Sequence, residues 1–169
     1  MSAPDFTNLT NLAASKLGGS PLSCSDDFFA EMENLTQPGR GIFIEDKYTD
    51  RGKWMDGWET RRKRKKGHDY LILKLGKPGK IHKVDIDTSY FSGNQPTKVS
   101  LDACFHKKQL PSKNTKWIKI LKKKSTKANS HHFFNIKNKS IFTHIKLNIY
   151  PDGGVARLRI YGSMQTERK

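Results

Sequence analysis

Residues 142–161 read FTHIKLNIYPDGGVARLRIY, and this stretch decides the fold. Apolar side chains recur at every second position in 142–150 and again in 155–161. A period of two is typical of a β-strand that buries one face. The positions expected to face inward are Ile145, Leu147, Ile149, Ala156, Leu158 and Ile160. Because Pro-Asp-Gly-Gly at 151–154 favours a turn, the stretch predicts two neighbouring strands with a short connection.

Similar patterns occur upstream of this stretch. Candidate strands span residues 70–75, 81–91, 99–105, 117–121 and 131–136. The connections at 76–79 and 92–96 are short and rich in Gly and Pro, which predicts turns. No helix of useful length separates the strands, so parallel βαβ units are excluded and an all-β, antiparallel sandwich is expected.

Two short helices are expected before the strands. Residues 8–17 place Leu9, Leu12 and Leu17 on one helical face, and a Gly pair follows. Ser25 can cap a second helix, since two aspartates follow it in the first turn.

Length and composition favour one soluble domain. The chain has 169 residues with 34% hydrophobic side chains, enough for one core. We expect a single domain over 1–169, with a disordered tail at 163–169. No apolar run is long enough to span a membrane and no secretory signal is visible, so a cytoplasmic location is expected. Cys24 and Cys104 lack a nearby second cysteine, which predicts free thiols.

The formal charge of +16 is unevenly distributed. Residues 1–102 carry 16 basic and 14 acidic side chains, whereas residues 103–169 carry 16 basic and 2 acidic ones. We interpret the lysine-rich stretches 106–116 and 122–130 as surface loops or the exposed end of a hairpin. Either they form a solvated rim, which is the usual state of such stretches, or they dock onto an acidic partner.

Familiar catalytic motifs are absent. The sequence contains no phosphate-binding loop, no dinucleotide fingerprint, no nucleophile elbow and no His-Glu-x-x-His. His131 and His132 are neighbours on a predicted strand, so they point to opposite faces and cannot chelate one ion together. We therefore expect no metal and no cofactor.

The segment 45–69 is too polar and too interrupted by Gly for a helix or a core strand, yet it holds Trp54 and Trp58. Long loops with aromatic and charged side chains are often functional. The alternative is an ordinary exposed connection whose basic end, Arg61 to Lys66, is solvated.

This segment contains KWMDGWETRRKR at 53–64 and GHD at 67–69, and these motifs resemble the allantoicase family. Further blocks resemble the same family in the same order, at 25–35, 85–94 and 143–159. The resemblance implies a galactose-binding-like jelly roll that hydrolyses allantoate to ureidoglycolate and urea. Family members resemble two tandem copies of this domain, and this chain holds one, similar to the first. Activity is then expected to require a homo-oligomer or pairing with a second repeat.

Such a reaction needs a clamp for the substrate carboxylate, a general acid and base, and hydrogen-bonding groups for the ureido moieties. The candidate catalytic residues are Glu59, Asp56, His68 and Asp87. The candidate substrate-binding residues are Arg61, Arg62, Trp58, Lys53, Asn94 and Arg157. Several have structural alternatives: Asp56 can form an Asx turn, Asp87 can tie two loops together, Trp58 can anchor the loop, and Arg157 can be an outward strand residue.

A non-catalytic binding module is the rival hypothesis. A basic β-sandwich can bind nucleic acid through its phosphates, but the aromatic residues are not interleaved with the lysines along the chain, so we expect no nucleic-acid partner. Carbohydrate binding is suggested by fold analogy alone.

Overall fold

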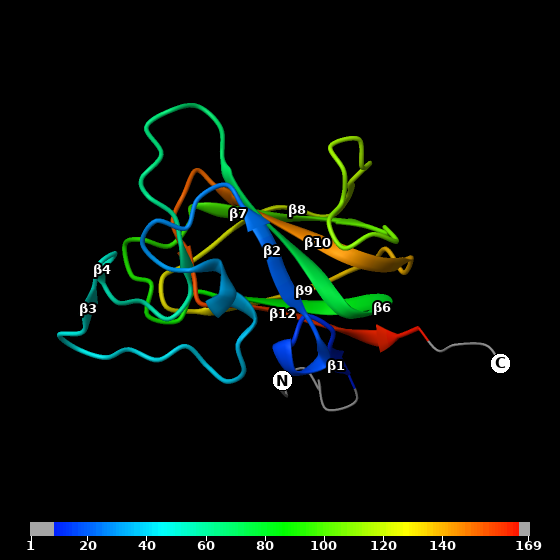
Figure 1. Cartoon of the computed structure of the whole chain (residues 1–169), viewed down its shortest axis with the longest axis horizontal. Helices are drawn as coiled ribbons and strands as arrows, with labels where there is room; N and C mark the ends of the chain where they lie inside the picture. The colour runs from blue at the N-terminus through cyan, green and yellow to red at the C-terminus, as the bar shows by residue number, and fades with distance from the viewer. Residues whose placement is uncertain (1–8, 166–169) are drawn as a thin grey trace.

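The computed structural model describes residues 9–165, and its strands form two layers (Figure 1). The strands are β1 (Thr10–Asn11), β2 (Ser20–Cys24), β3 (Tyr48–Thr49), β4 (Gly52–Lys53), β5 (Trp58–Glu59), β6 (Asp69–Asp87), β7 (Lys98–Cys104), β8 (Ile118–Ser125), β9 (His131–Asn135), β10 (Ile141–Tyr150), β11 (Gly154–Val155) and β12 (Arg157–Met164). Two short 3₁₀ helices, η1 (Ser15–Leu17) and η2 (Met32–Thr36), accompany them. Every pairing between these strands is antiparallel, as predicted.

Strand β6 belongs to both layers. Its first part, 69–74, lies between β2 and β10, and β7 and β8 continue that layer. Its last part, 83–87, lies between β12 and β9, and β1 completes the second layer. The 19-residue strand thus joins the two halves of the sandwich.

The expected turn at 76–79 is wrong, because β6 runs through it without a break. The two glycines have another role there. A Cβ on Gly76 would lie 2.5 Å from the carbonyl oxygen of Leu17, and one on Gly79 would lie 2.5 Å from that of Ser163. Backbone segments approach these positions so closely that no side chain fits.

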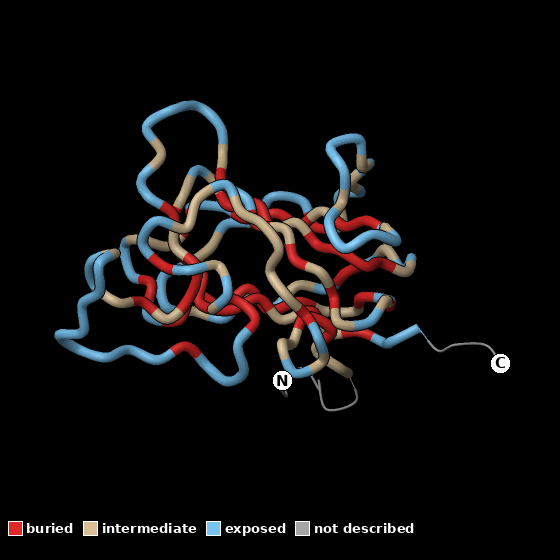
Figure 2. Tube along the Cα trace, in the orientation of Figure 1, coloured by how far each residue is buried: buried red, intermediate tan, exposed pale blue. Residues whose placement is uncertain are grey.

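The core lies between the layers, and the alternation read from the sequence is confirmed there. Ile145, Leu147 and Ile149 of β10 are fully buried, as are Leu158 and Ile160 of β12. Buried segments follow the central strands, whereas the loops are largely exposed (Figure 2). Cys24 and Cys104 are free thiols, as expected.

The two expected N-terminal helices are not formed. Residue 8 lies outside the described residues, Thr10–Asn11 is strand β1, and only the turn η1 is helical. The Asn11 side chain accepts hydrogen bonds from the backbone N–H of Ala13 and Ile160, so it fixes a non-helical turn. Ser25 bonds to Asp69 and Tyr70 of β6 instead of capping a helix, and η2 starts seven residues later.

Other boundaries also differ from the predictions. Residues 163–164 continue β12 and residues 122–125 belong to β8, although lysines 122–124 are exposed as expected. None of the helices in residues 9–165 is long and apolar enough to cross a membrane.

Candidate functional site

The predicted loop is anchored at one end of the sandwich by the short ladder of β5 and β11. Trp58 pairs with Val155 and Glu59 with Gly154. The Trp58 indole is fully buried and donates a hydrogen bond to the carbonyl oxygen of Asp26, at 2.8 Å. Trp58 therefore anchors the loop, and its burial leaves no surface for a substrate, contrary to the binding role predicted for it.

Glu59 and Arg61 are two residues apart at the end of this ladder. Trp58 and Thr60 beside them are buried, whereas Glu59 is half-buried and Arg61 is exposed. The Glu59 carboxylate accepts a hydrogen bond from the Asn94 amide at 3.2 Å. Burial raises the pKa of Glu59, and the bond from Asn94 offsets only part of this effect. Glu59 can thus hold a proton at higher pH than an ordinary glutamate.

Asn94 has a second feature of a binding group. Its side-chain oxygen is buried and has no hydrogen-bond partner among the described residues. Its backbone carbonyl accepts from Gly154 at 2.7 Å, which holds the loop after β6 against β11. A buried acceptor without a donor is costly, so a ligand N–H or a water would stabilise this position.

Arg61 is held by Asp26. Its Nε donates to one carboxylate oxygen at 2.8 Å, and its backbone N–H donates to the other at 2.9 Å. Burial alone would raise the pKa of Asp26, but the hydrogen bonds from Phe28 and Arg61 outweigh it and hold this pKa below its usual value. The Arg61 side chain is 63% exposed and lies over the Phe28 ring, with its guanidinium carbon 4.6 Å from the ring centroid. A fixed, accessible guanidinium is suited to a carboxylate ligand.

Two hollows border Arg61. One has a volume of about 570 Å³, and the other of about 620 Å³. The first is lined by Ser25, Asp26, Arg61, Arg62, Lys63, Arg64, Lys65 and Asp69. The second is lined by Ser25, Asp26, Asp27, Phe28, Asp50, Arg51 and Arg61. Arg62, the alternative clamp, also lines the first hollow, whereas Glu59 lines neither.

Asp56 and Arg157 form a buried ion pair. Arg157 Nη2 lies 2.9 Å from Asp56 Oδ2, and their side chains are 4% and 11% exposed. The same oxygen accepts a hydrogen bond from the backbone N–H of Ile42 at 3.0 Å. Arg157 alternates with the core residue Leu158, as predicted, but the loop that contains Ile42 covers its side chain, so that it is buried and not exposed. The pair ties the 39–44 loop to β12, and Arg157 is not exposed to bind a carboxylate.

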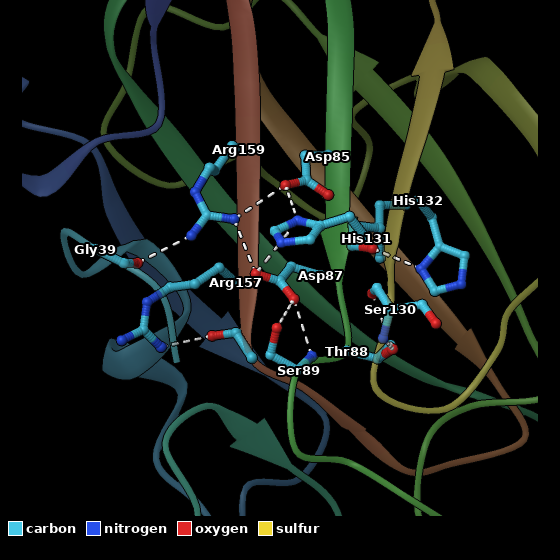
Figure 3. A network of polar contacts seen from close by, with 12 residues as sticks. Gly39, Asp85, Asp87, Thr88, Ser89, Ser130, His131, His132, Arg157 and Arg159 are labelled. Carbon is cyan, nitrogen blue, oxygen red and sulfur yellow. Dashed lines mark hydrogen bonds and ion pairs between the residues drawn. The ribbon is translucent and has the colours of Figure 1, made fainter. Parts of the chain in front are cut away.

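Asp87 belongs to a second charged network, shown in Figure 3. Arg159 Nη1 lies 3.0 Å from one oxygen of Asp85 and 3.0 Å from one oxygen of Asp87. His131 Nδ1 lies 2.8 Å from the same Asp85 oxygen. Ser89 donates both its N–H and its hydroxyl to Asp87. Arg159 also donates to the Gly39 carbonyl at 2.9 Å, so this network, like the previous one, holds the 39–44 loop.

The two aspartates titrate differently. Burial raises the pKa of Asp85 despite its bonds to His131 and Arg159. For Asp87 the hydrogen bonds from Ser89 and Arg159 outweigh burial, so its pKa is lowered. Asp85, Asp87 and His131 present ligand atoms within 4.8 Å of one another. Arg159 already supplies the cation between the two carboxylates, so these residues do not fit a metal ion without displacing it.

His68 and Lys53 contact other parts of the molecule. His68 Nε2 lies 3.1 Å from the Asn148 side-chain oxygen, on the outer face of the sheet. Lys53 lies over the ring of Phe43, with its Nζ 4.8 Å from the centroid. Phe43 in turn stacks on Tyr90. The residues predicted from the sequence thus fall into several sets of contacts: Glu59 with Asn94, Arg61 with Asp26, Asp56 with Arg157, and Asp87 with Arg159.

The two-layer sandwich with its loops gathered at one end defines the class of protein. The fold matches the carbohydrate-binding module CBM32-3 of a family 31 glycoside hydrolase from Clostridium perfringens, with a TM-score of 0.65 at 10% identity, over 96% of this chain and all of that one. At this identity the likeness shows the fold alone, a galactose-binding-like β-sandwich.

The allantoicase repeat model matches residues 10–165, so the chain belongs to the allantoicase family. It is 53% identical over 163 residues to a probable allantoicase of Acinetobacter baylyi, covering 95% of this chain and 48% of that protein. The allantoicase structure from Saccharomyces cerevisiae superposes with a TM-score of 0.79 at 38% identity, over 91% of this chain and 48% of that one. The chain spans about half the length of these relatives.

Proposed function

We propose that this chain provides half of an allantoicase site and that Glu59, Asn94 and Arg61 lie in it. The observation that carries the proposal is their arrangement. A half-buried carboxyl group with a raised pKa and an accessible guanidinium lie two residues apart on one anchored segment. This pairing of a proton donor with an anion clamp meets the demands of the reaction.

Allantoate carries a carboxylate and two ureido groups on one carbon. In the proposed route, protonated Glu59 donates its proton to the nitrogen of one ureido group, and the bond from that nitrogen to the central carbon breaks. Urea leaves while the nitrogen lone pair of the other ureido group forms a carbon–nitrogen double bond. Water then adds to the central carbon and returns a proton to Glu59, so that one water is consumed and ureidoglycolate forms.

The neighbouring groups have supporting roles in this scheme. Arg61, with Arg62 beside it in the hollow, binds the substrate carboxylate. Asn94 orients Glu59 through its amide, and its unpartnered oxygen accepts from a ureido N–H. Asp56, Asp87 and Arg157 support the loops around the site. His68 contacts Asn148 and Lys53 contacts Phe43, so we assign neither residue a role in the reaction.

A complete site would need a second repeat in addition to this one. Because the relatives are about twice as long as this chain, a second repeat or another copy of the chain would supply the remaining groups. A homo-oligomer would supply the same loops twice.

The test is urea release from allantoate, measured with the purified protein alongside its mass in solution. Glu59→Gln keeps the size and the Asn94 contact but removes the transferable proton, and we expect kcat to fall about 10²-fold or more. Arg61→Ala should mainly raise KM, because it removes the carboxylate clamp. Lys77→Ala, on an exposed position of β6, is the control and should change neither.

Two results would contradict the proposal. The first is a wild-type chain that releases no urea in any oligomeric state it forms and none when it is combined with a second allantoicase repeat. The second is a Glu59→Gln variant that keeps near-native turnover, which would show that another group transfers the proton.

A further inference from the structure

The outer face of the layer that contains β8 carries a polar network outside the proposed allantoicase site. The amide nitrogen of Asn148 on β10 donates to Ser100 at 3.1 Å and to Asp102 at 2.8 Å, both on β7. Lys119 of β8 lies 2.9 Å from the other Asp102 oxygen. Asn148 and Ser100 are buried. The network therefore holds three adjacent strands in a fixed register and makes this face a rigid platform.

Aromatic rings and lysines alternate on this face. Lys146 Nζ lies between two rings, 4.6 Å from the centroid of Trp117 and 5.5 Å from that of Tyr70. Lys123 Nζ lies 4.2 Å from the centroid of the Tyr150 ring. These residues come from three segments of the chain, β6, β8 with the residue before it, and β10, so their interleaving is a product of the sheet pairing.

The charge of the face is almost entirely positive. Segment 106–125 carries eight lysines and no acidic side chain. Lysines 122–124 of β8 are exposed at the edge of the layer, and Lys123 lies on this face, whereas Lys122 and Lys124 alternate to the other side of the strand. Strand β8 is an edge strand that pairs only with β7 among the described strands. The loops 61–67 and 106–117 project from the same side of the sandwich, one at each end of this layer (Figure 1). Both are rich in basic residues.

We propose that this face binds single-stranded nucleic acid without strong sequence preference. Lysines contact the phosphates, and their number gives an affinity that falls steeply with salt. Trp117 and Tyr70, at the lysine-flanked positions, provide surfaces on which bases stack, as in other platforms for single strands. Inorganic polyphosphate would contact the lysines but has no group that stacks on the rings. The alternation of rings and cations matches a ligand that alternates bases and phosphates.

The experiment measures fluorescence anisotropy of a labelled single-stranded 20-mer at about physiological ionic strength, with length-matched duplex and inorganic polyphosphate as competitors. The wild-type protein should bind the single strand and prefer it to polyphosphate. Lys122→Glu, Lys123→Glu and Lys124→Glu together should weaken binding at least about tenfold, because several phosphate contacts are lost. Trp117→Leu should weaken it about fivefold or more through lost stacking. Tyr70→Leu is the second ring variant.

The matched control is the triple variant Lys77→Glu, Lys80→Glu and Lys137→Glu, which changes the net charge equally at exposed positions on other segments. It should keep most of the affinity. Equal losses in the two triple variants, or equal binding of polyphosphate and the single strand, would overturn the proposal and leave only a generic charge effect. If Trp117→Leu unfolds by circular dichroism, Tyr70→Leu decides: unchanged binding in that folded variant overturns the role of the rings.

Discussion

The loop end of the sandwich and its outer lysine-rich face use charge in opposite ways. At the loop end, cations and carboxylates are paired and buried, as in Asp56 with Arg157 and in Arg159 between Asp85 and Asp87. On the outer face, most lysines of β8 are exposed. Buried charges need their partners to be tolerated, whereas exposed charges are solvated whether or not they are paired. Charge at the loop end therefore sets structure, and charge on the face is available for association.

The largest expected difference is in the free energy of unfolding, when the cation of one ion pair is removed in each region. Arg157→Met removes the cation of a buried pair and leaves Asp56 without it, so we expect a loss of about 3 kcal/mol in the free energy of unfolding. Lys119→Met removes the cation from an equally short pair with Asp102, but the Lys119 side chain is 45% exposed. That loss should be only about 0–1 kcal/mol.

Urea-induced unfolding of the two variants measures this difference. The double variant Asp56→Asn with Arg157→Met should regain part of the stability, since no buried charge is then left alone. If Arg157→Met and Lys119→Met lower the free energy of unfolding equally, the two regions do not differ in how their charges contribute to stability.

These pairings also show what could be predicted from the sequence. The alternation of apolar and polar residues in β10 predicted which side chains are buried, because every second side chain of a strand points to the same face of the sheet. The inward position of Ala156, Leu158 and Ile160 was equally readable. The same alternation placed Arg157 outward, but it did not predict the burial of this side chain, because its partner Asp56 lies 101 residues away. Local patterns contain no information on such a partner.

The turn expected at 76–79 failed for a related reason. Glycine marks either a turn or a close approach of another backbone, and only the position of Leu17 and Ser163 distinguishes the two. The site was predicted in part. The motif at 53–64 pointed to Glu59 and Arg61, but the role of Asp26 and the position of Arg159 between two carboxylates emerge only from the fold. Likewise, lysines and rings that are separate along the chain are interleaved across β6, β8 and β10.

A smaller effect is expected at Glu59, where function opposes stability. Its pKa is raised by burial, so the folded state binds the proton more tightly than the unfolded chain does. Stability from this group is present at low pH and is lost as the pH rises through the folded pKa. At neutral pH the wild type thus carries the cost of a partly buried carboxylate, which Glu59→Gln removes. We expect the variant to have a higher Tm at pH 7.

The pH dependence separates this cause from others. The gain in Tm should shrink as the pH falls through the raised pKa of folded Glu59 and should be lost below about 4.5, the ordinary pKa of a glutamate, because the wild-type residue is then neutral in both the folded and the unfolded state. A gain that stays constant from pH 4 to pH 8 would show that the substitution acts through packing and not through charge.

The smallest effect on stability is expected at the edge strand β8, from the reversal of lysines 122–124 to glutamate. All three residues are exposed, and isolated surface charges contribute about 0–1 kcal/mol each. Neighbouring lysines also repel one another, so the reversal relieves some repulsion within segment 106–125 and offsets part of any loss. We expect Tm and urea release to stay near the wild-type values while the affinity for single strands falls. A triple variant that unfolds, or that loses urea release as an isolated protein, would show that this face supports the fold or the allantoicase site, and the contrast between the two regions would fail there.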